Sequence, residues 1–165
     1  MNNKILAVED DPTQQFVLKV VLESYGLQAD IVSTAEKALE HLDSEDNDYA
    51  LILMDIRLPG MDGYDCSRLI RKKDCARISS IPILAVTAYA ASEDRRQCLE
   101  AGMNDYISKP YQLDVFQRLI NKYMQNGSDF ERVRPLSFEE EREFDPLGLL
   151  QNKQMSDGGA FVPGV

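Results

Sequence analysis

The chain has 165 residues, 44% of them hydrophobic, and a formal net charge of -10 at pH 7. This length and composition are typical of one globular domain with a modest extension. The acidic balance argues against sequence-independent binding to nucleic acid and against adhesion to a membrane of anionic lipid, because both depend on basic surface. We therefore expect proteins or small cationic species as partners, with no nucleic acid and no membrane.

The cysteines and the N-terminus indicate the compartment. Cys66, Cys75 and Cys98 are widely spaced, and the chain holds a single histidine. This pattern disfavours a disulfide framework or a zinc site and suits a reducing environment. The opening stretch MNNKILAVEDD has a short apolar run broken by acids, which resembles neither a signal peptide nor a membrane span. The expected localisation is cytoplasmic.

Short apolar runs alternate along the chain with amphipathic segments of helical length. The runs that look like buried strands are residues 5–8, 29–32, 50–54, 81–86 and 105–107. Strands separated in this way by helices form a parallel sheet that is covered on both faces. The sequence therefore predicts an α/β fold with a doubly wound, five-stranded parallel sheet.

The first two helices lie between these runs. Pro12 suits the first position of a helix that ends at Gly26. We expect an apolar stripe of this helix to face the core: Phe16, Val17, Val20, Val21 and Leu22. Ser33 and Glu36 have the spacing of a capping box for the second helix.

The remaining helices follow the third, fourth and fifth runs. A basic cluster near the third helix is interpreted as a solvated face: Arg68, Arg71, Lys72 and Lys73. Ser92 is expected to cap a helix that Gly102 closes. Pro110 is expected to open the last helix, with these side chains facing inward: Leu113, Phe116, Leu119, Ile120 and Tyr123.

The helical pattern stops near residue 126. Residues 126–165 hold eight acidic and four basic residues, a net charge of -4, with a glycine-rich end. Ser137 and Glu140 could cap one short helix there, which would be weak by itself. We expect residues 1–125 to form one domain and residues 126–165 to form an acidic extension, either with one short helix or disordered.

Polar residues follow four of the strands where each strand ends. Glu9 and Asp10 follow the first run, Asp55 the third, Thr87 the fourth, and Lys109 comes just after the fifth. Parallel strands bring their carboxyl ends to one edge of the sheet, and ligands bind where the strand order reverses. For the flavodoxin-like order 2-1-3-4-5, that reversal lies between the strands that deliver the acids. A lone Asp55 is well explained as a turn residue, but the combination indicates a site.

This combination of residue types favours phosphoryl chemistry. Converging carboxylates repel each other unless they bind a cation, and all-oxygen ligation suits Mg²⁺. The ion and Lys109 would stabilise a phosphoryl group, with the hydroxyl of Thr87 as a further donor. Asp55 would be the nucleophile, since an aspartate can form an acyl phosphate.

Four segments resemble one protein family over residues 3 to 125: KILAVEDDP, LILMDIRLPGMDGYD, IPILAVTAYA and AGMNDYISKP. They resemble the receiver domains of two-component response regulators, and their residues are most similar to those of receivers that serve hybrid sensor kinases and phosphorelays. The resemblance implies that Asp55 is the phosphoacceptor. It implies that Asp10, Asp55 and the backbone carbonyl of Arg57 ligate Mg²⁺, while Glu9, where aspartate is more frequent, acts through water. It also implies that Lys109 holds a phosphoryl oxygen next to a cis Lys109-Pro110 bond.

The resemblance further implies a switch and its partners. Thr87 and Tyr106 match the pair in which the hydroxyl moves to the phosphoryl group and the aromatic ring turns inward. The surface made by the helix from Ser92, the strand at 105–107 and the last helix would then report the state. The implied phosphodonor is a sensor histidine kinase or a histidine phosphotransfer protein, and the implied output is a downstream protein target.

Two other functions are compatible with parts of the sequence. Mg²⁺-dependent phosphohydrolases of the haloacid dehalogenase type also place an Asp nucleophile after a strand, but they usually carry a second Asp two residues later, where this chain has Arg57. A DNA-binding regulator would need an output module, and the extension is too short and too acidic for one. We therefore expect a phosphoacceptor with slow autodephosphorylation rather than an enzyme. The side chains of Arg57 and Tyr89, at the mouth of the site, are expected to slow that hydrolysis.

Overall fold

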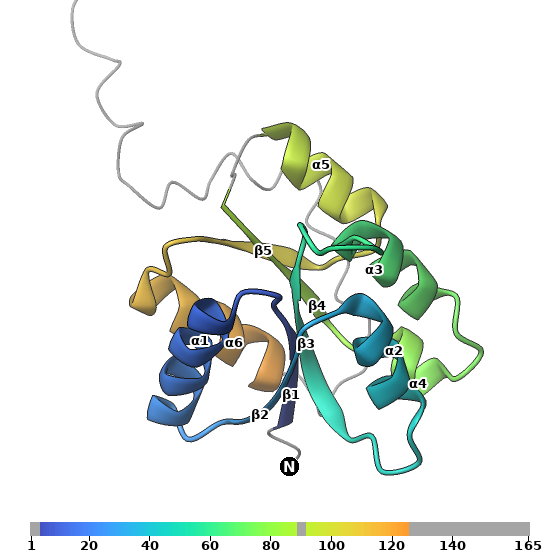
Figure 1. The fold of residues 1–165 in the computed structure, drawn as a ribbon, viewed down its shortest axis with the longest axis horizontal. Helices are drawn as coiled ribbons and strands as arrows, with labels where there is room; N and C mark the ends of the chain where they lie inside the picture. The colour runs from blue at the N-terminus through green and yellow to red at the C-terminus, as the bar shows by residue number, and fades with distance from the viewer. Residues whose placement is uncertain (1–3, 89–91, 126–165) are drawn as a thin grey trace, which may run out of the picture. The chain divides into compact units, whose positions relative to one another are not determined.

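The structure is a computed structural model that describes residues 4–88 and 92–125. Five parallel strands form one sheet: β1 (Lys4–Val8), β2 (Gln28–Val32), β3 (Tyr49–Asp55), β4 (Ile83–Thr87) and β5 (Asp105–Ser108). Their order is β2-β1-β3-β4-β5, as expected, so the order reverses between β1 and β3. Figure 1 shows the helices on both sides of this sheet.

Alternation along each strand creates two cores. On one side α1 (Pro12–Ser24) and α6 (Leu113–Gln125) cover strand residues such as Leu51 and Leu53. On the other side the sheet contributes Ile52 and Met54, and the covering helices are α2 (Ala35–Asp43), α3 (Gly63–Arg71), α4 (Ala76–Ser79) and α5 (Ser92–Glu100). Residues buried on both faces explain why the strands appear in the sequence as continuous apolar runs.

The start of α1 is as expected, but its buried face is not. The Asp11 carboxylate caps the helix by accepting hydrogen bonds from the backbone N–H of residues 13 and 14. Leu18 and Leu22 are the buried residues of α1, whereas Phe16 is 68% exposed and Val17 and Val20 are also exposed. The helix has apolar residues on two faces, and the prediction chose the wrong one for these three residues.

The structure also differs from the predicted helices in three details. Thr34, not Ser33, caps α2, because its hydroxyl accepts a hydrogen bond from the N–H of Lys37 at 3.2 Å. The short helix α4 was not predicted. The last helix begins at Leu113 rather than at Pro110, and Leu113 is 55% exposed. Pro110 lies in the preceding loop, where the Lys109-Pro110 peptide bond is cis, as the family resemblance implied.

Arg71 is not part of a solvated basic face. Its guanidinium is half-buried and donates from Nε to the carbonyl of Gly102 at 2.7 Å and from Nη1 to the carbonyls of Ser79 and Ile81 at 2.9 and 2.8 Å. Nη2 donates to the amide oxygen of Asn104 at 2.9 Å. Gly102 has a φ of 85°, and a Cβ there would lie 2.7 Å from Cγ of Arg71. Arg71 thus ties the end of α3 to the segments that lead into β4 and β5.

The chain divides into two units, Met1–Pro135 and Leu136–Val165, and every described residue belongs to the first. The expected extension, residues 126–165, lies outside the described residues, so the boundary after residue 125 stays a prediction. In the described part of the chain, the helices lack the length and apolar character needed to cross a membrane.

Candidate functional site

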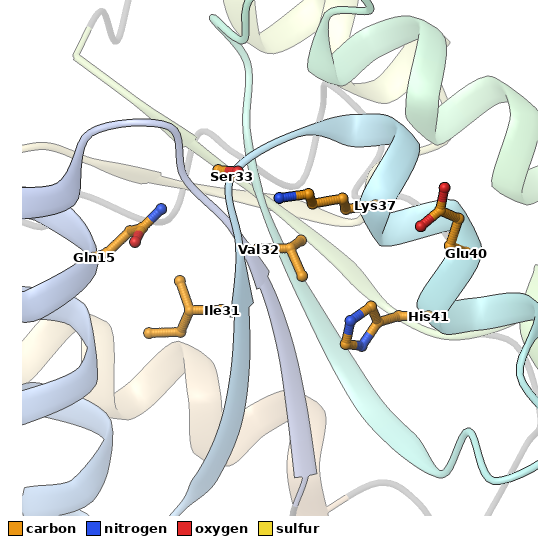
Figure 2. Close-up of a pocket in the computed structure, with 7 residues that line it drawn as sticks. All are labelled: Gln15, Ile31, Val32, Ser33, Lys37, Glu40 and His41. Atoms are coloured by element: carbon orange, nitrogen blue, oxygen red, sulfur yellow. The ribbon is translucent and has the colours of Figure 1, made fainter.

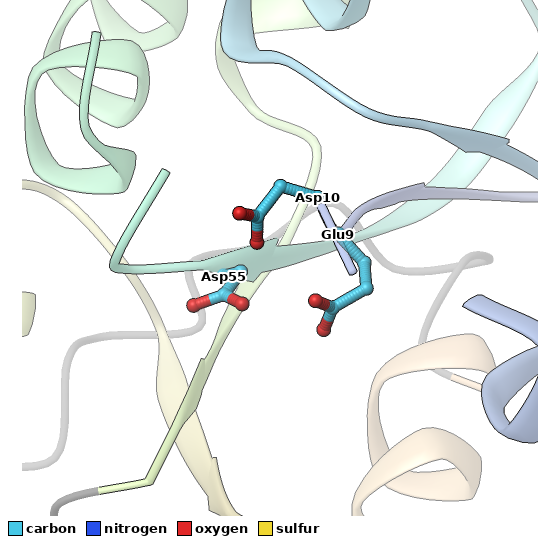
Figure 3. A group of neighbouring side chains, drawn as sticks. All are labelled: Glu9, Asp10 and Asp55. Atoms are coloured by element: carbon cyan, nitrogen blue, oxygen red, sulfur yellow. The ribbon is translucent and has the colours of Figure 1, made fainter. Parts of the chain in front are cut away.

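The carboxyl edge of the sheet brings the predicted acids together. Glu9 and Asp10 directly follow β1, and Asp55 is the last residue of β3. Figure 3 shows the three carboxylates turned toward a common space. One carboxylate oxygen from each residue lies within 4.8 Å of the others. Glu9 and Asp55 are buried at 2% and 7% exposure, while Asp10 is exposed at the rim.

Lys109 connects two of these acids. Its ammonium group lies 2.5 Å from Oε2 of Glu9 and 3.0 Å from Oδ2 of Asp55. Strand alternation explains the meeting, because Ala7, Leu53 and Ile107 belong to the α1/α6 core, and the three charged residues lie two positions further along. The extra methylene of glutamate, compared with aspartate, lengthens the reach of residue 9 toward Lys109.

The electrostatics of the site leave an excess of negative charge. Burial raises the pKa of Glu9, and the hydrogen bond from Lys109 only partly opposes this. Burial acts against the charge of Lys109, but its hydrogen bonds to Glu9 and Asp55 outweigh burial and raise the pKa of Lys109. One ammonium group therefore faces three carboxyl groups, a donor set that suits a hard cation with oxygen ligands.

Backbone and side-chain donors fix the positions of the acids. The N–H of Arg57 donates to Oδ1 of Asp55 at 3.0 Å, and the N–H of Asp11 donates to Oε1 of Glu9 at 3.2 Å. The amide of Gln15 donates to the backbone carbonyl of Glu9 at 2.6 Å. The sequence reasoning missed this contact of Gln15 because nothing in a helical pattern marks a side chain that turns back to the strand.

Gly63 is a second position whose importance was missed. A Cβ at this residue would lie 2.2 Å from the backbone oxygen of Asp55, so only glycine fits without displacing the end of β3. The N–H of Gly63 donates to the carbonyl of Ile56 at 2.9 Å and closes the loop. Gly63, the first residue of α3, therefore determines how closely the loop approaches the end of β3.

A cavity of about 560 Å³ opens next to the acids, on the side of the sheet that α3 and α5 cover. Asp10, Arg57 and Thr87 contribute to its lining. Thr87 is the last residue of β4 and is 6% exposed. A second cavity of about 430 Å³ lies beside β2 and α2 (Figure 2). None of the residues predicted for phosphoryl chemistry lines that second cavity, so we assign the site to the first.

Tyr106 lies apart from the acidic cluster, on edge strand β5. It pairs in register with Ala85 of β4, and Thr87 pairs with Ser108, so Tyr106 and Thr87 share the sheet face that α5 covers.

The hydrolysis gate was predicted for Arg57 and Tyr89, and Tyr89 lies outside the described residues. The gate therefore stays a prediction.

Comparison with known proteins identifies the family. The family described as "Response regulator receiver domain" matches residues 5–121. Hybrid signal transduction histidine kinase L of Dictyostelium discoideum is 35% identical over 127 residues, which cover 76% of this chain and 7% of the kinase. Sensor histidine kinase RcsC of Escherichia coli (strain K12) is 35% identical over 130 residues, which cover 79% of this chain and 12% of the kinase. The chain thus spans about a tenth of the length of these relatives.

A solved structure supports the same assignment. The receiver domain of sensor histidine kinase PA1611 from Pseudomonas aeruginosa PAO1 matches with a TM-score of 0.67 and 39% sequence identity, over 76% of this chain and 99% of that one. That structure is described as having a magnesium ion coordinated in the active site cleft. From the sequence match, the strand order and the acidic site together, the chain belongs to the response regulator receiver domain family.

Proposed function

We propose that this protein receives a phosphoryl group from a phosphohistidine of a partner protein onto Asp55. The observation that supports this most strongly is the bridge that the half-buried Lys109 forms between Glu9 and Asp55, beside the exposed Asp10. In the transfer, a carboxylate oxygen of Asp55 forms a bond to phosphorus while the phosphorus–nitrogen bond to the donor histidine breaks. The bonding electrons leave with the imidazole, and water later hydrolyses the acyl phosphate.

The residues present fit Mg²⁺. The cluster offers carboxylate oxygens, the ligands that this ion prefers, in an environment of excess negative charge. Asp10, Asp55 and the backbone carbonyl of Arg57 would ligate the ion directly, and Glu9 would act through water. A bound Mg²⁺ would neutralise charge on the phosphoryl oxygens. The ammonium group of Lys109 would hold one of these oxygens. To do so, it would have to release Glu9 or Asp55 as a hydrogen-bond partner.

The face of α1 next to the site is the proposed docking surface for the phosphodonor. Thr13 and Gln14 lie at the start of α1, and Phe16, Val17 and Val20 are exposed further along it. Exposed apolar side chains that gather on one surface are typical of protein contacts. The relatives named as histidine kinases support a histidine kinase or a histidine phosphotransfer protein as the donor.

The output is proposed to be a conformational change rather than catalytic turnover. The hydroxyl of Thr87 would move to the phosphoryl group, the ring of Tyr106 would turn inward, and the surface of α5, β5 and α6 would change for a downstream protein.

The test is phosphorylation by a small donor. The protein is incubated with Mg²⁺ and acetyl phosphate, and the adduct is located by mass spectrometry under conditions that preserve acyl phosphates. We expect up to one phosphate per chain on Asp55, no adduct on Asp55→Asn, and a wild-type level on the matched control Asp62→Asn, which changes another acid that lines the cavity. An adduct that survives in Asp55→Asn would contradict the proposal, and rapid release of many phosphates per chain would favour the phosphohydrolase.

A further inference from the structure

The ring of Tyr106 is covered by a cation from α5. The guanidinium carbon of Arg95 lies 4.8 Å from the centroid of the ring. Both side chains are half-buried, so the contact is partly shielded from water. A cation over an aromatic face is attracted by the ring quadrupole, and a planar guanidinium also stacks on the ring. This contact joins α5 to β5 within the surface proposed to report the phosphorylation state.

The small side chain of Ala85 would allow the ring of Tyr106 to turn toward Thr87. The strand neighbour of Tyr106 is Ala85, whose side chain is a single methyl group, and Thr87 lies two residues further along the same face. A ring that turned toward Thr87 would pass over this small residue. The cation–π contact depends on the present position of the ring under the guanidinium, so a turn of the ring would break or rearrange it.

We infer that Arg95 is a positioning residue that holds the ring of Tyr106 in the orientation that the structure shows and so lowers the population of the switched state. The inference rests on the proposed function, because it assigns Tyr106 to the switch. A cation–π contact at a partly exposed position corresponds to roughly a two- to fivefold change in an equilibrium. Arg95 therefore biases the switch without touching the phosphoryl group.

The experiment compares two adjacent arginines. Arg95→Ala removes the cation over the ring, whereas Arg96→Ala makes the same change of charge at the next residue, which is exposed and lies 3.2 Å from Glu100. Affinity for beryllofluoride, a mimic of the phosphoryl group, is measured in saturating Mg²⁺. We expect Arg95→Ala to bind it roughly two- to fivefold more tightly than the wild type. The beryllofluoride affinity of Arg95→Lys should lie between those of the wild type and Arg95→Ala, and that of Arg96→Ala should equal the wild-type value. Affinity for Mg²⁺ alone should stay unchanged in every variant.

A second measurement tests the contact in the free protein. The ring signals of Tyr106, labelled with carbon-13 and assigned by their loss in Tyr106→Phe, are expected to shift in Arg95→Ala and to stay in place in Arg96→Ala. Unchanged ring signals in Arg95→Ala, or equal changes in beryllofluoride affinity for both arginine variants, would overturn the inference. Beryllofluoride that binds equally well to Asp55→Asn would instead overturn the proposed function, and the ring signals would still decide whether Arg95 holds Tyr106.

Discussion

Lys109 and Arg71 are both shielded cations, but one has charged partners and the other has neutral ones. Lys109 lies between the carboxylates of Glu9 and Asp55, and these hydrogen bonds raise its pKa in spite of burial. Arg71 donates to three backbone carbonyls and one side-chain amide, and burial lowers its pKa to about 10. The partners of Lys109 carry negative charge that a metal ion could also neutralise, while the partners of Arg71 are neutral oxygens that hold the guanidinium by hydrogen bonds.

The difference separates chemistry from architecture. The carboxylates beside Lys109 could take a metal ion as a further cationic partner, and the ammonium group could exchange a carboxylate for a phosphoryl oxygen. The carbonyls around Arg71 belong to segments on either side of β4 and α5, so their loss would loosen the fold without touching the acids. Changing each cation should therefore give opposite patterns of activity and stability.

The largest effect is expected for Lys109→Met. Removing the ammonium group takes away a charged donor at the phosphoryl position, which typically lowers the rate of reaction by about a hundredfold or more. The rate is measured with acetyl phosphate and Mg²⁺, and Lys122→Met, a lysine 3.3 Å from Asp105, is the control. A rate within roughly threefold of the wild type, against the expected loss of about a hundredfold, would remove the distinction between the two cations.

Arg71→Met is expected to act on stability instead. Four acceptors would each lose a hydrogen bond in a half-buried setting, so the free energy of unfolding should fall by about 3 kcal/mol. Arg68→Met is the matched control, because Arg68 is exposed and forms a surface pair with Asp65 at 2.8 Å. Denaturant unfolding measures both variants. If the folded fraction of Arg71→Met phosphorylates much more slowly than the wild type, Arg71 is not purely structural.

Phe16→Glu tests docking of the phosphodonor, a function that depends on neither Lys109 nor Arg71. The side chain is 68% exposed, so its loss should change the free energy of unfolding by less than about 0.5 kcal/mol. If α1 is the docking surface, transfer from a protein donor should slow by about tenfold, a common cost for one interface residue, while the reaction with acetyl phosphate stays the same. Equal slowing with both donors would place the defect in the site rather than in docking.

The smallest effect concerns a third cation, Lys4, which lies 2.9 Å from Asp30 near the surface. Burial would raise the pKa of Asp30, but hydrogen bonds from Tyr49 and Lys4 outweigh it and lower the pKa. A lowered carboxyl pKa gives stability that is present above about pH 4 and is lost as the pH falls through the lowered value. Because solvent screens the pair, Asp30→Asn should remove at most about 1 kcal/mol at pH 7 and less at pH 3. Unfolding measured at both pH values checks the sign, and a larger loss at pH 3 would contradict it.

The sequence predicted the parts of the molecule whose pattern is local. Buried parallel strands are apolar on both faces, so the runs that end before Glu9, Asp55 and Lys109 were visible, and strand alternation then fixed where these side chains meet. The family resemblance added the cis bond at Lys109-Pro110, which the structure confirms. The roles of the individual site residues remain predictions until phosphorylation is measured.

The failures of prediction share a different cause. Phe16 and Leu18 are both apolar, and only the packing of α1 on the sheet determines that Leu18 is buried. Arg71 looks like its solvated neighbours because its acceptor on Gly102 is 31 residues away in sequence. Gln15 also acts through a contact between different elements, since it holds the end of β1 from α1. Such pairings between elements have no periodic signature in the sequence.

The close approach of Gly63 to the Asp55 carbonyl has a consequence for protein engineering. A chimera that exchanged the loop after β3 with that of another receiver would have to keep the strand end and this glycine from the same parent. The segment from Asp55 to Gly63 is therefore the smallest block that can be transplanted intact. A graft that placed any other residue at position 63 would push its Cβ against the carbonyl of Asp55.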